Sequence, residues 1–154
     1  MQILDAKDNG QFLPELARAL HEEWGAEQGY TFEETLEWCR DVAASTVETI
    51  LVAVEADQFV GTASLVENDL GEPTEYTPWL ASLWIDPAQR KKGIASRLVT
   101  AIEELAHSQG HEELFLFCVE GTLPDFYERL GWQKREQIVN LGRRCRIMSR
   151  NLVK

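Results

Sequence analysis

The strongest chemical signal in the sequence is a run of three cations, Arg90, Lys91 and Lys92, directly before a predicted helix. Cations at a helix N-terminus face the positive end of the helix dipole, which costs about a few tenths of a kcal/mol or more for each charge. The small residues Gly93 and Ala95 let the backbone approach a ligand closely and leave N–H groups free to point outward. Both features are explained if an anion such as a pyrophosphate binds there.

A solvated turn is the alternative interpretation of this cationic run, because runs of like charge usually face solvent. The segment contains neither GxGxxG nor GxxxxGK[S/T], the glycine patterns of two widespread phosphate-binding loops. The sequence therefore excludes both of those loops and predicts a phosphate binder of a different kind.

Tyr127 and two glutamates are the candidates for proton transfer. A phenol has an unperturbed pKa of ~10, so it is protonated at neutral pH and can donate a proton to a leaving group. Simple packing in or beside the core is the alternative for a tyrosine in a short amphipathic helix. Glu67 and Glu120 follow predicted strands and are the best candidates to accept a proton from an attacking nucleophile.

The remaining nucleophilic and metal-binding residue types show no catalytic pattern. The three cysteines, an odd number without a CxxC pair, predict reduced thiols and a cytoplasmic protein, and no secretory signal is expected. Cys118 lies in an apolar strand, where a thiol behaves as a small hydrophobic group. The histidines lack metal-ligand spacing, so no metal is predicted. These residues are Cys39, Cys118, Cys145, His21, His107 and His111.

A second basic patch, formed by Arg143, Arg144, Arg146 and Arg150, lies near the end of the sequence. We expect it on a solvated edge strand, where charges block unwanted strand pairing. Contact with the phosphate of an adenosine-containing ligand is the alternative.

Hydrophobic periodicity predicts an α/β fold with a mixed sheet in the order β-α-α-β-β-β-α-β-α-β-β. Helices are expected from Asn9 to about Gln28, from a capping box of Thr31 and Glu34, from Ala95 to Ser108, and after Thr122 as N-cap. A strand, a helix and a buried strand in succession predict one parallel crossover. The expected strands are an edge strand at 3–4 and strands at 49–55, 58–66, 79–85, 113–119, 132–141 and 143–152.

Length and composition favour a single domain over residues 1–154. With 44% apolar residues, the chain can bury a core without disulfides or metal. The 15 basic and 26 acidic residues give a net charge of −11, which argues against nucleic acid or an anionic membrane surface as a partner. The longest apolar run, Leu114–Val119, is far shorter than the roughly 20 residues that span a bilayer.

Two motifs together resemble the GNAT N-acetyltransferase superfamily. Arg90-Lys-Lys-Gly-Ile-Ala95 matches the R-x-x-G-x-G/A loop that binds the pyrophosphate of acyl-CoA, and Leu83-Trp-Ile-Asp-Pro87 resembles the strand end that holds the pantetheine arm. Phe126-Tyr-Glu-Arg-Leu-Gly-Trp132 resembles the later Y-x-x-x-G-F/W segment, one helix and one strand further on. The resemblance implies a GNAT-like fold and acetyl-CoA as cosubstrate.

The resemblance also implies roles for particular residues. Backbone groups at the strand end would pair with the pantetheine, N–H groups of the loop would hold the pyrophosphate, and Tyr127 would protonate the leaving thiolate. Many members carry an asparagine before the tyrosine helix, where this sequence has Glu120-Gly121-Thr122. The implied cosubstrate-binding residues are Leu83, Trp84, Ile85, Arg90, Lys91, Lys92, Gly93, Ile94, Ala95 and Ser96.

We therefore expect an acetyltransferase that moves an acetyl group from acetyl-CoA to a primary amine of a small molecule or peptide, by direct attack. A non-catalytic acyl-CoA sensor is the alternative, and Tyr127 favours the enzyme. An acidic cleft would concentrate a cationic amine. Solubility is the alternative explanation of these acidic residues. A homodimer is compatible with the sequence, which does not fix the oligomeric state. The acidic residues expected on the acceptor side are Glu22, Glu23, Glu27, Glu33, Glu34, Glu37, Glu67, Asp69, Glu72 and Glu75.

Overall fold

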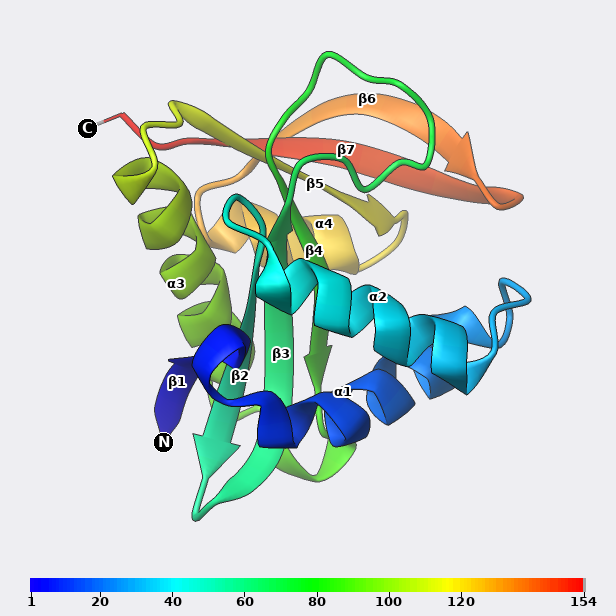
Figure 1. Cartoon of the computed structure of the whole chain (residues 1–154). Helices are drawn as coiled ribbons and strands as arrows, with labels where there is room; N and C mark the ends of the chain where they lie inside the picture. Colours follow the sequence, from blue (N-terminus) through cyan, green and yellow to red (C-terminus); the bar gives the residue numbers. More distant parts are fainter. Residues whose placement is uncertain (154) are drawn as a thin grey trace.

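The computed structural model describes residues 1–153, which form a seven-stranded mixed sheet with helices on both faces (Figure 1). The strand order is β1-β2-β3-β4-β5-β7-β6, and β4 and β5 are the parallel neighbours. The predicted fold class and element order are confirmed. The strands are β1 (Gln2–Asp5), β2 (Thr49–Glu55), β3 (Gln58–Val66), β4 (Trp79–Ile85), β5 (Glu113–Val119), β6 (Gln133–Asn140) and β7 (Arg143–Asn151).

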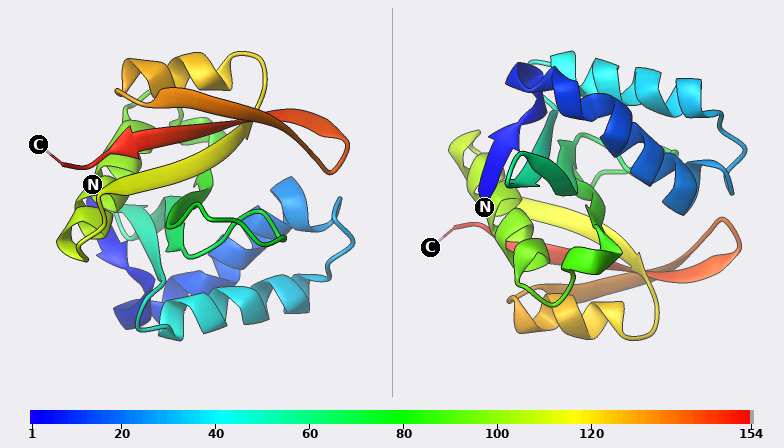
Figure 2. Two further views of the ribbon diagram at one scale, coloured as in Figure 1. Left: turned by 90° about the horizontal axis from the view of Figure 1, so that it is seen from above. Right: turned by 90° about the horizontal axis from the view of Figure 1, so that it is seen from below.

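Four α-helices divide between the two faces of this sheet. Helices α1 (Leu13–Leu20) and α2 (Phe32–Ala44) cover one face, and α3 (Ile94–Ser108) and α4 (Leu123–Arg129) cover the other (Figure 2). Each face buries its own apolar cluster, because successive strand side chains point to opposite sides. Within residues 1–153, no helix has the length and hydropathy needed to cross a membrane.

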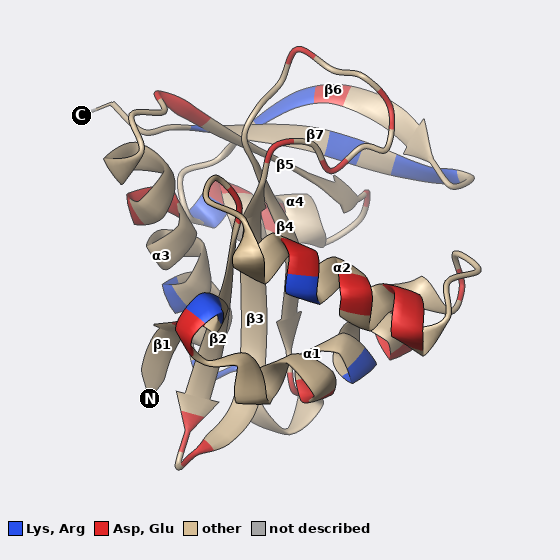
Figure 3. Ribbon diagram, viewed as in Figure 1, with Lys and Arg blue, Asp and Glu red and all other residues tan. Residues whose placement is uncertain are grey.

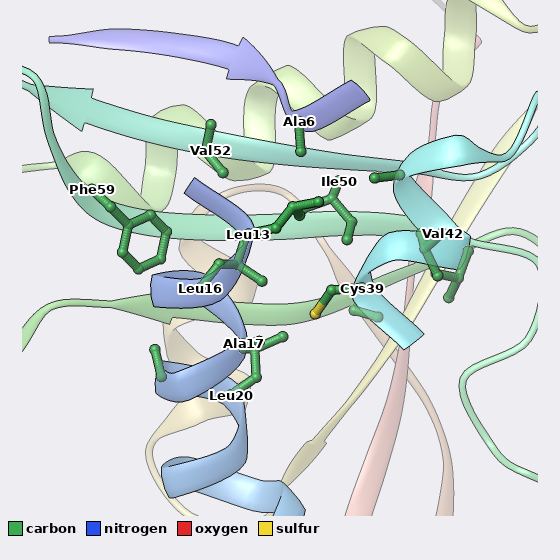
Figure 4. Packing of buried hydrophobic residues seen from close by; sticks show 14 of the residues in the cluster. Ala6, Leu13, Leu16, Ala17, Leu20, Cys39, Val42, Ile50, Val52 and Phe59 are labelled. Atoms are coloured by element: carbon green, nitrogen blue, oxygen red, sulfur yellow. The ribbon is translucent and has the colours of Figure 1, made fainter. Parts of the chain in front are cut away.

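The cluster under α1 and α2 shows how the helices are held on the sheet (Figure 4). Leu16 of α1 and Cys39 of α2 are both fully buried, in one cluster with Ile50 and Val52 of β2. Fully burying an aliphatic side chain contributes about 1.5–3 kcal/mol. This cluster therefore fixes α1 and α2 against the sheet.

The capping box predicted at the start of α2 is present. The Glu34 N–H donates to Thr31 Oγ1 at 3.1 Å, and the Thr31 N–H donates to Glu34 Oε1 at 3.0 Å. The helix predicted before it is divided into a 3₁₀ turn (Gly10–Phe12), α1, and a π-helical turn (His21–Gly25). Spacings of three and four residues do not distinguish these helix types over one turn, so the periodicity could not resolve them.

One expectation from the sequence is confirmed only in part, and one is wrong. Thr122 is the N-cap residue of α4, as predicted, but it has helical backbone angles, φ −89° and ψ −19°, and its side chain makes no capping bond. The second basic patch does not lie on an edge strand, because β7 is flanked by β5 and β6, and β6 forms the edge. Three of the four arginines of β7 instead reach carboxylates outside the strand: Arg143 pairs with Glu27, Arg146 with Glu120, and Arg150 with Glu103.

Candidate active site

The sheet opens between its two parallel strands. Trp79 of β4 is paired with Phe115 of β5, and this is the one residue pair that joins the two strands within residues 1–153. Beyond it β5 turns away from β4 (Figure 1). The edge of β4 that faces β5 therefore keeps backbone N–H and C=O groups without a strand partner, and such groups are obligatory hydrogen-bonding groups. We call this opening the β4–β5 gap.

A β-bulge lies in β4 beside the gap. Ser64 of β3 pairs with Ala81, whereas Thr62 pairs with Trp84, so β4 contains one extra residue between these pairs. Ser82 takes up the distortion with φ +55°. Bulges re-aim backbone groups and occur often beside active sites.

The three residues predicted to hold the pantetheine follow this bulge. Leu83 and Trp84 are half-buried and Ile85 is buried. The Trp84 ring stacks on Phe59 with ring centroids 5.7 Å apart and an angle of 1° between the planes. Leu83 packs with the cluster under α3 and α4, on the opposite face. The structure thus anchors both sides of this strand end while its edge stays open toward the gap.

The cationic loop follows directly. The Asp86 side chain accepts a bond from the Ala88 N–H at 3.0 Å, which begins a 3₁₀ turn at Pro87–Gln89. Arg90 Nε donates to the Ile85 carbonyl oxygen at 3.0 Å, so this guanidinium caps the end of β4. Lys92 Nζ donates to Gln89 Oε1 at 2.9 Å. Lys91 and Lys92 are exposed at the N-terminus of α3, as predicted.

The backbone of this loop is strained at two residues, and its N–H groups are left free to bind a ligand. Lys91 has φ +66° and Gly93, the N-cap of α3, has φ +80°. A non-glycine residue at positive φ costs about 1 kcal/mol or more, and such strain clusters at functional sites. No side chain caps α3, so the N–H groups of Ile94, Ala95 and Ser96 lack an intrahelical partner and an acceptor side chain among the described residues. This arrangement suits a phosphate-bearing anion.

Tyr127 lies on the α3–α4 face, where it is 6% exposed. Its ring packs edge-on against Trp132, with centroids 6.0 Å apart, and against Phe126 at 5.0 Å. Within residues 1–153 its hydroxyl has no hydrogen-bond partner. Burial, reinforced by the nearby Cys118, raises the pKa of Tyr127 well above its ordinary value. The phenol is therefore held protonated with its proton uncommitted.

Sequence reasoning missed Glu103, a carboxylate that together with Arg150 lies beside Trp132. Its indole Nε1 donates to Glu103 Oε2 at 3.0 Å, Arg150 Nε lies 3.7 Å from Glu103 Oε1, and Arg150 Nη1 donates to the Gly131 carbonyl oxygen at 2.9 Å. The sequence did contain a signal for Glu103. It lies four residues after Val99 and three before Ala106, so a charged residue occupies the apolar face of α3.

The two predicted base candidates lie at different ends of the gap. Glu67 follows Val66, which pairs with Trp79 at the closed end, and it is exposed. Glu120 follows the carboxyl end of β5, and its Oε1 accepts a bond from Arg146 Nε at 2.7 Å. The structure therefore does not bring the two carboxylates together, and the assignment of either as base stays a prediction.

The family model described as the acetyltransferase (GNAT) family matches residues 12–132. This match spans the β4–β5 gap, the cationic loop and Tyr127. The chain belongs to the GNAT acetyltransferase family. The expected resemblance is confirmed, and with it the chain is an acyl-CoA-dependent acetyltransferase. No curated protein sequence matches it.

Solved structures share the fold of this GNAT acetyltransferase. An aminoglycoside 6′-N-acetyltransferase complexed with coenzyme A is 19% identical, with a TM-score of 0.80 over 100% of this chain and 98% of that chain. The aminoglycoside 6′-N-acetyltransferase from Enterococcus faecium is 19% identical, with a TM-score of 0.78 over the same shares. A ribosomal-protein-alanine N-acetyltransferase from Brucella melitensis is also 19% identical, with a TM-score of 0.76 over 98% and 99%.

The acetyltransferase has two adjoining hollows beside the closed end of the gap. One, of about 440 Å³, lies between the β3–β4 loop and β6 and β7; the other, of about 490 Å³, shares Glu75 and Tyr76 with it. Tyr76 donates its hydroxyl proton to Glu136 between them. We call the first the acidic hollow; it is lined by Leu70, Glu72, Pro73, Thr74, Glu75, Tyr76, Glu136, Ile138 and Ile147.

The charges of this GNAT acetyltransferase are unevenly placed. Acidic positions predominate along α2 and occur in the β3–β4 loop, whereas basic positions gather on β6 and β7 (Figure 3). All six glutamates predicted for the first two helices are exposed, and of these Glu27 pairs with Arg143. All three cysteines are free and buried. Burial raises the pKa of Cys118 to about 12, so this thiol is not an available nucleophile.

Proposed function

We propose that this acetyltransferase moves the acetyl group of acetyl-CoA directly to a primary amine of a small molecule or a peptide. The observation that carries the proposal is the loop at Arg90–Ser96, whose unpartnered N–H groups lie next to the open edge of β4. An anion site at one end of an open strand edge suits a ligand that joins a pyrophosphate to an amide-containing arm.

The residues present fit acetyl-CoA. The N–H groups of Gly93, Ile94, Ala95 and Ser96, with the exposed ammonium groups of Lys91 and Lys92, would hold the pyrophosphate. Arg90 would support this site through the backbone, because its guanidinium is committed to the Ile85 carbonyl oxygen. The open edge of Leu83–Ile85 would pair with the amides of the pantetheine arm.

The reaction forms a C–N bond between the amine and the acetyl carbon and breaks the C–S bond of the thioester. Backbone N–H groups after the bulge would stabilise negative charge on the carbonyl oxygen. Tyr127 would donate its proton to the departing thiolate sulfur. Glu67 or Glu120 would accept the proton that the amine loses. No covalent enzyme intermediate is required, because one cleft would hold both substrates.

A small cationic amine is the acceptor that the acidic hollow supports. Glu72, Glu75 and Glu136 line its rim, and the aliphatic side chains Ile138 and Ile147 form part of its wall. Carboxylates attract an ammonium group, and the aliphatic wall suits a carbon skeleton. Aminoglycoside acetyltransferases are among the proteins of the same fold. The three free cysteines support a cytoplasmic location.

Thiol release from acetyl-CoA, measured across polyamines, aminoglycosides, amino acids and peptide N-termini, tests this proposal. We expect release with at least one small cationic amine and with no anionic acceptor. CoA binding without thiol release for any amine would instead identify a non-catalytic sensor. Thiol release that leaves the amine unmodified would show hydrolysis in place of transfer.

A further inference from the structure

Glu103 occupies a place on α3 that packing alone does not explain. Its side chain is 17% exposed, on the helix face that carries the buried residues Val99, Ile102 and Ala106. Removing a carboxylate from water is costly unless it is paired and hydrogen-bonded. Both of its oxygens have a partner: Oε2 accepts from the Trp132 indole at 3.0 Å, and Oε1 faces Arg150 Nε at 3.7 Å.

The surroundings of Glu103 disfavour its charged form. Burial raises the pKa of Glu103, and the neighbouring Glu104 adds to this effect. Arg150 of β7 and the Trp132 indole counter it only in part. An apolar residue of similar volume at such a site is often neutral or stabilising. A role in orienting Trp132 accounts for the charge better than a role in stability.

Trp132 links this carboxylate to the candidate acid. Its indole is 2% exposed and held by Glu103 at Nε1. Its backbone N–H donates to the Tyr127 carbonyl oxygen at 3.1 Å, and its ring lies edge-on to the Tyr127 ring at 6.0 Å. The Tyr127 hydroxyl has no hydrogen bond of its own within the described chain, so these contacts and Phe126 set its direction.

Helix α3, which carries Glu103, begins at the anion-binding loop. Glu103 lies nine positions after Ile94 in one continuous helix, a distance of about 14 Å along the helix axis. One rigid element therefore joins the loop that would hold the pyrophosphate to the carboxylate that fixes Trp132. Through α3 and Trp132, the position of the Tyr127 hydroxyl is fixed relative to the loop that would hold the cosubstrate.

We infer that Glu103 is a positioning residue for acetyl transfer, which acts through the Trp132 indole to aim the Tyr127 hydroxyl at the thiol leaving group. This inference rests on the proposed function, in which Tyr127 is the acid. It predicts that loss of the Glu103 charge lowers kcat and leaves acetyl-CoA binding unchanged, and that the effect requires the Tyr127 hydroxyl.

A double-mutant cycle tests the inference. We expect Tyr127→Phe to lower kcat about 10²-fold and Glu103→Gln to lower it about tenfold, each with the KM for acetyl-CoA unchanged within about twofold. In the Tyr127→Phe background, Glu103→Gln should lower kcat less than about twofold. Glu128→Gln, which breaks the exposed 3.6 Å pair between α4 and Lys134, is the matched control and should leave kcat unchanged.

The possible outcomes separate the two proposals. An equal loss of kcat from Glu103→Gln in both backgrounds, or no loss in the parent enzyme, overturns the positioning role while Tyr127 remains the acid. A Tyr127→Phe enzyme with full kcat overturns the acid itself, and the positioning role with it. If Glu103→Gln does not fold, Trp132→Phe takes its place in the same cycle, since it removes the indole N–H donor together with part of the ring that packs on Tyr127.

Discussion

Arg150 Nη1 lies where a side chain at Gly131 would be: a Cβ built on Gly131 would overlap the guanidinium. The same nitrogen donates to the Gly131 carbonyl oxygen at 2.9 Å, and Gly131 has φ +96°. The positive φ favours glycine here, and a Cβ would also force the Arg150 guanidinium, the far end of a flexible side chain, to move. This contact ties β7 to the turn that carries Trp132.

Gly131→Ala should therefore destabilise the fold by about 2–4 kcal/mol, because positive φ and a displaced Arg150 act together. Gly29→Ala is the matched control, since Gly29 has φ +87° and open space around it. We expect it to lose only about 1–2 kcal/mol in urea unfolding. An equal loss in the two variants would mean that Arg150 moves aside freely.

The anion-binding loop can be tested at Gly93. A Cβ on Gly93 meets open space, so Gly93→Trp should fold and place a large ring in front of the free N–H groups of the loop. We expect CoA affinity to fall about 100-fold or more, since charge-assisted hydrogen bonds contribute about 1.5–3 kcal/mol each. Calorimetric titration with CoA measures this affinity.

Gly110→Trp is the control for the strain that Gly93→Trp introduces. Gly110 follows the other end of α3, has φ +90° and is equally open, so both variants carry the same backbone cost. Its affinity for CoA should match that of the parent enzyme. A folded Gly93→Trp variant with unchanged CoA affinity would remove the loop from the cosubstrate site.

Elements with strong local signals were predicted from the sequence to the residue. The bounds of β2, β3, β4 and β5 agree with the expected strands, because apolar runs and turns mark both of their ends. The hairpin turn at Ala56–Asp57 formed although both residues have positive φ, since the strands on either side pair along their whole length. Cross-strand pairing there outweighs the unfavourable turn residues.

Features that depend on distant partners could not be predicted. The interior place of β7 follows from pairing with β5 and β6, and no local pattern encodes which strand forms an edge. The cationic loop was predictable because the conflict between its charges and the helix dipole is local. The contacts among Glu103, Trp132 and Arg150 join three segments far apart in sequence, so they emerge only in the fold.

Asp69, in the β3–β4 loop, predicts a measurable dependence of stability on pH. Burial raises the pKa of Asp69 to about 7, from an ordinary value of 3.8. Because the folded pKa is the higher one, the contribution of this group to stability is complete below pH 3.8 and is lost as the pH rises through 7. Asp69→Asn removes that loss.

We therefore expect Asp69→Asn to raise the Tm at pH 8 by several degrees, since each unit of pKa difference corresponds to about 1.4 kcal/mol. About 1 kcal/mol shifts the Tm of a chain of this size by about 2–4 °C. At pH 4 the variant and the parent should melt together. Asp41→Asn, on the exposed face of α2, is the control. Its Tm difference from the parent should be the same at pH 4 and pH 8. A Tm difference that does not change with pH would show that Asp69 ionises freely in the folded protein.

The acidic hollow predicts how the enzyme responds to salt. If Glu72 and Glu75 attract a cationic acceptor, the KM for that amine should rise about threefold between low salt and 0.5 M salt, because exposed charges are screened beyond about 10 Å at 0.1 M. The double variant Glu72→Gln, Glu75→Gln should have a raised KM at low salt that changes little as salt is added. The double variant Asp8→Asn, Glu104→Gln removes the same net charge from exposed sites elsewhere and should keep the salt dependence of the parent enzyme. If the two double variants have the same KM, the KM depends on net charge alone. The acceptor would then respond to the field of the whole protein and not to the hollow.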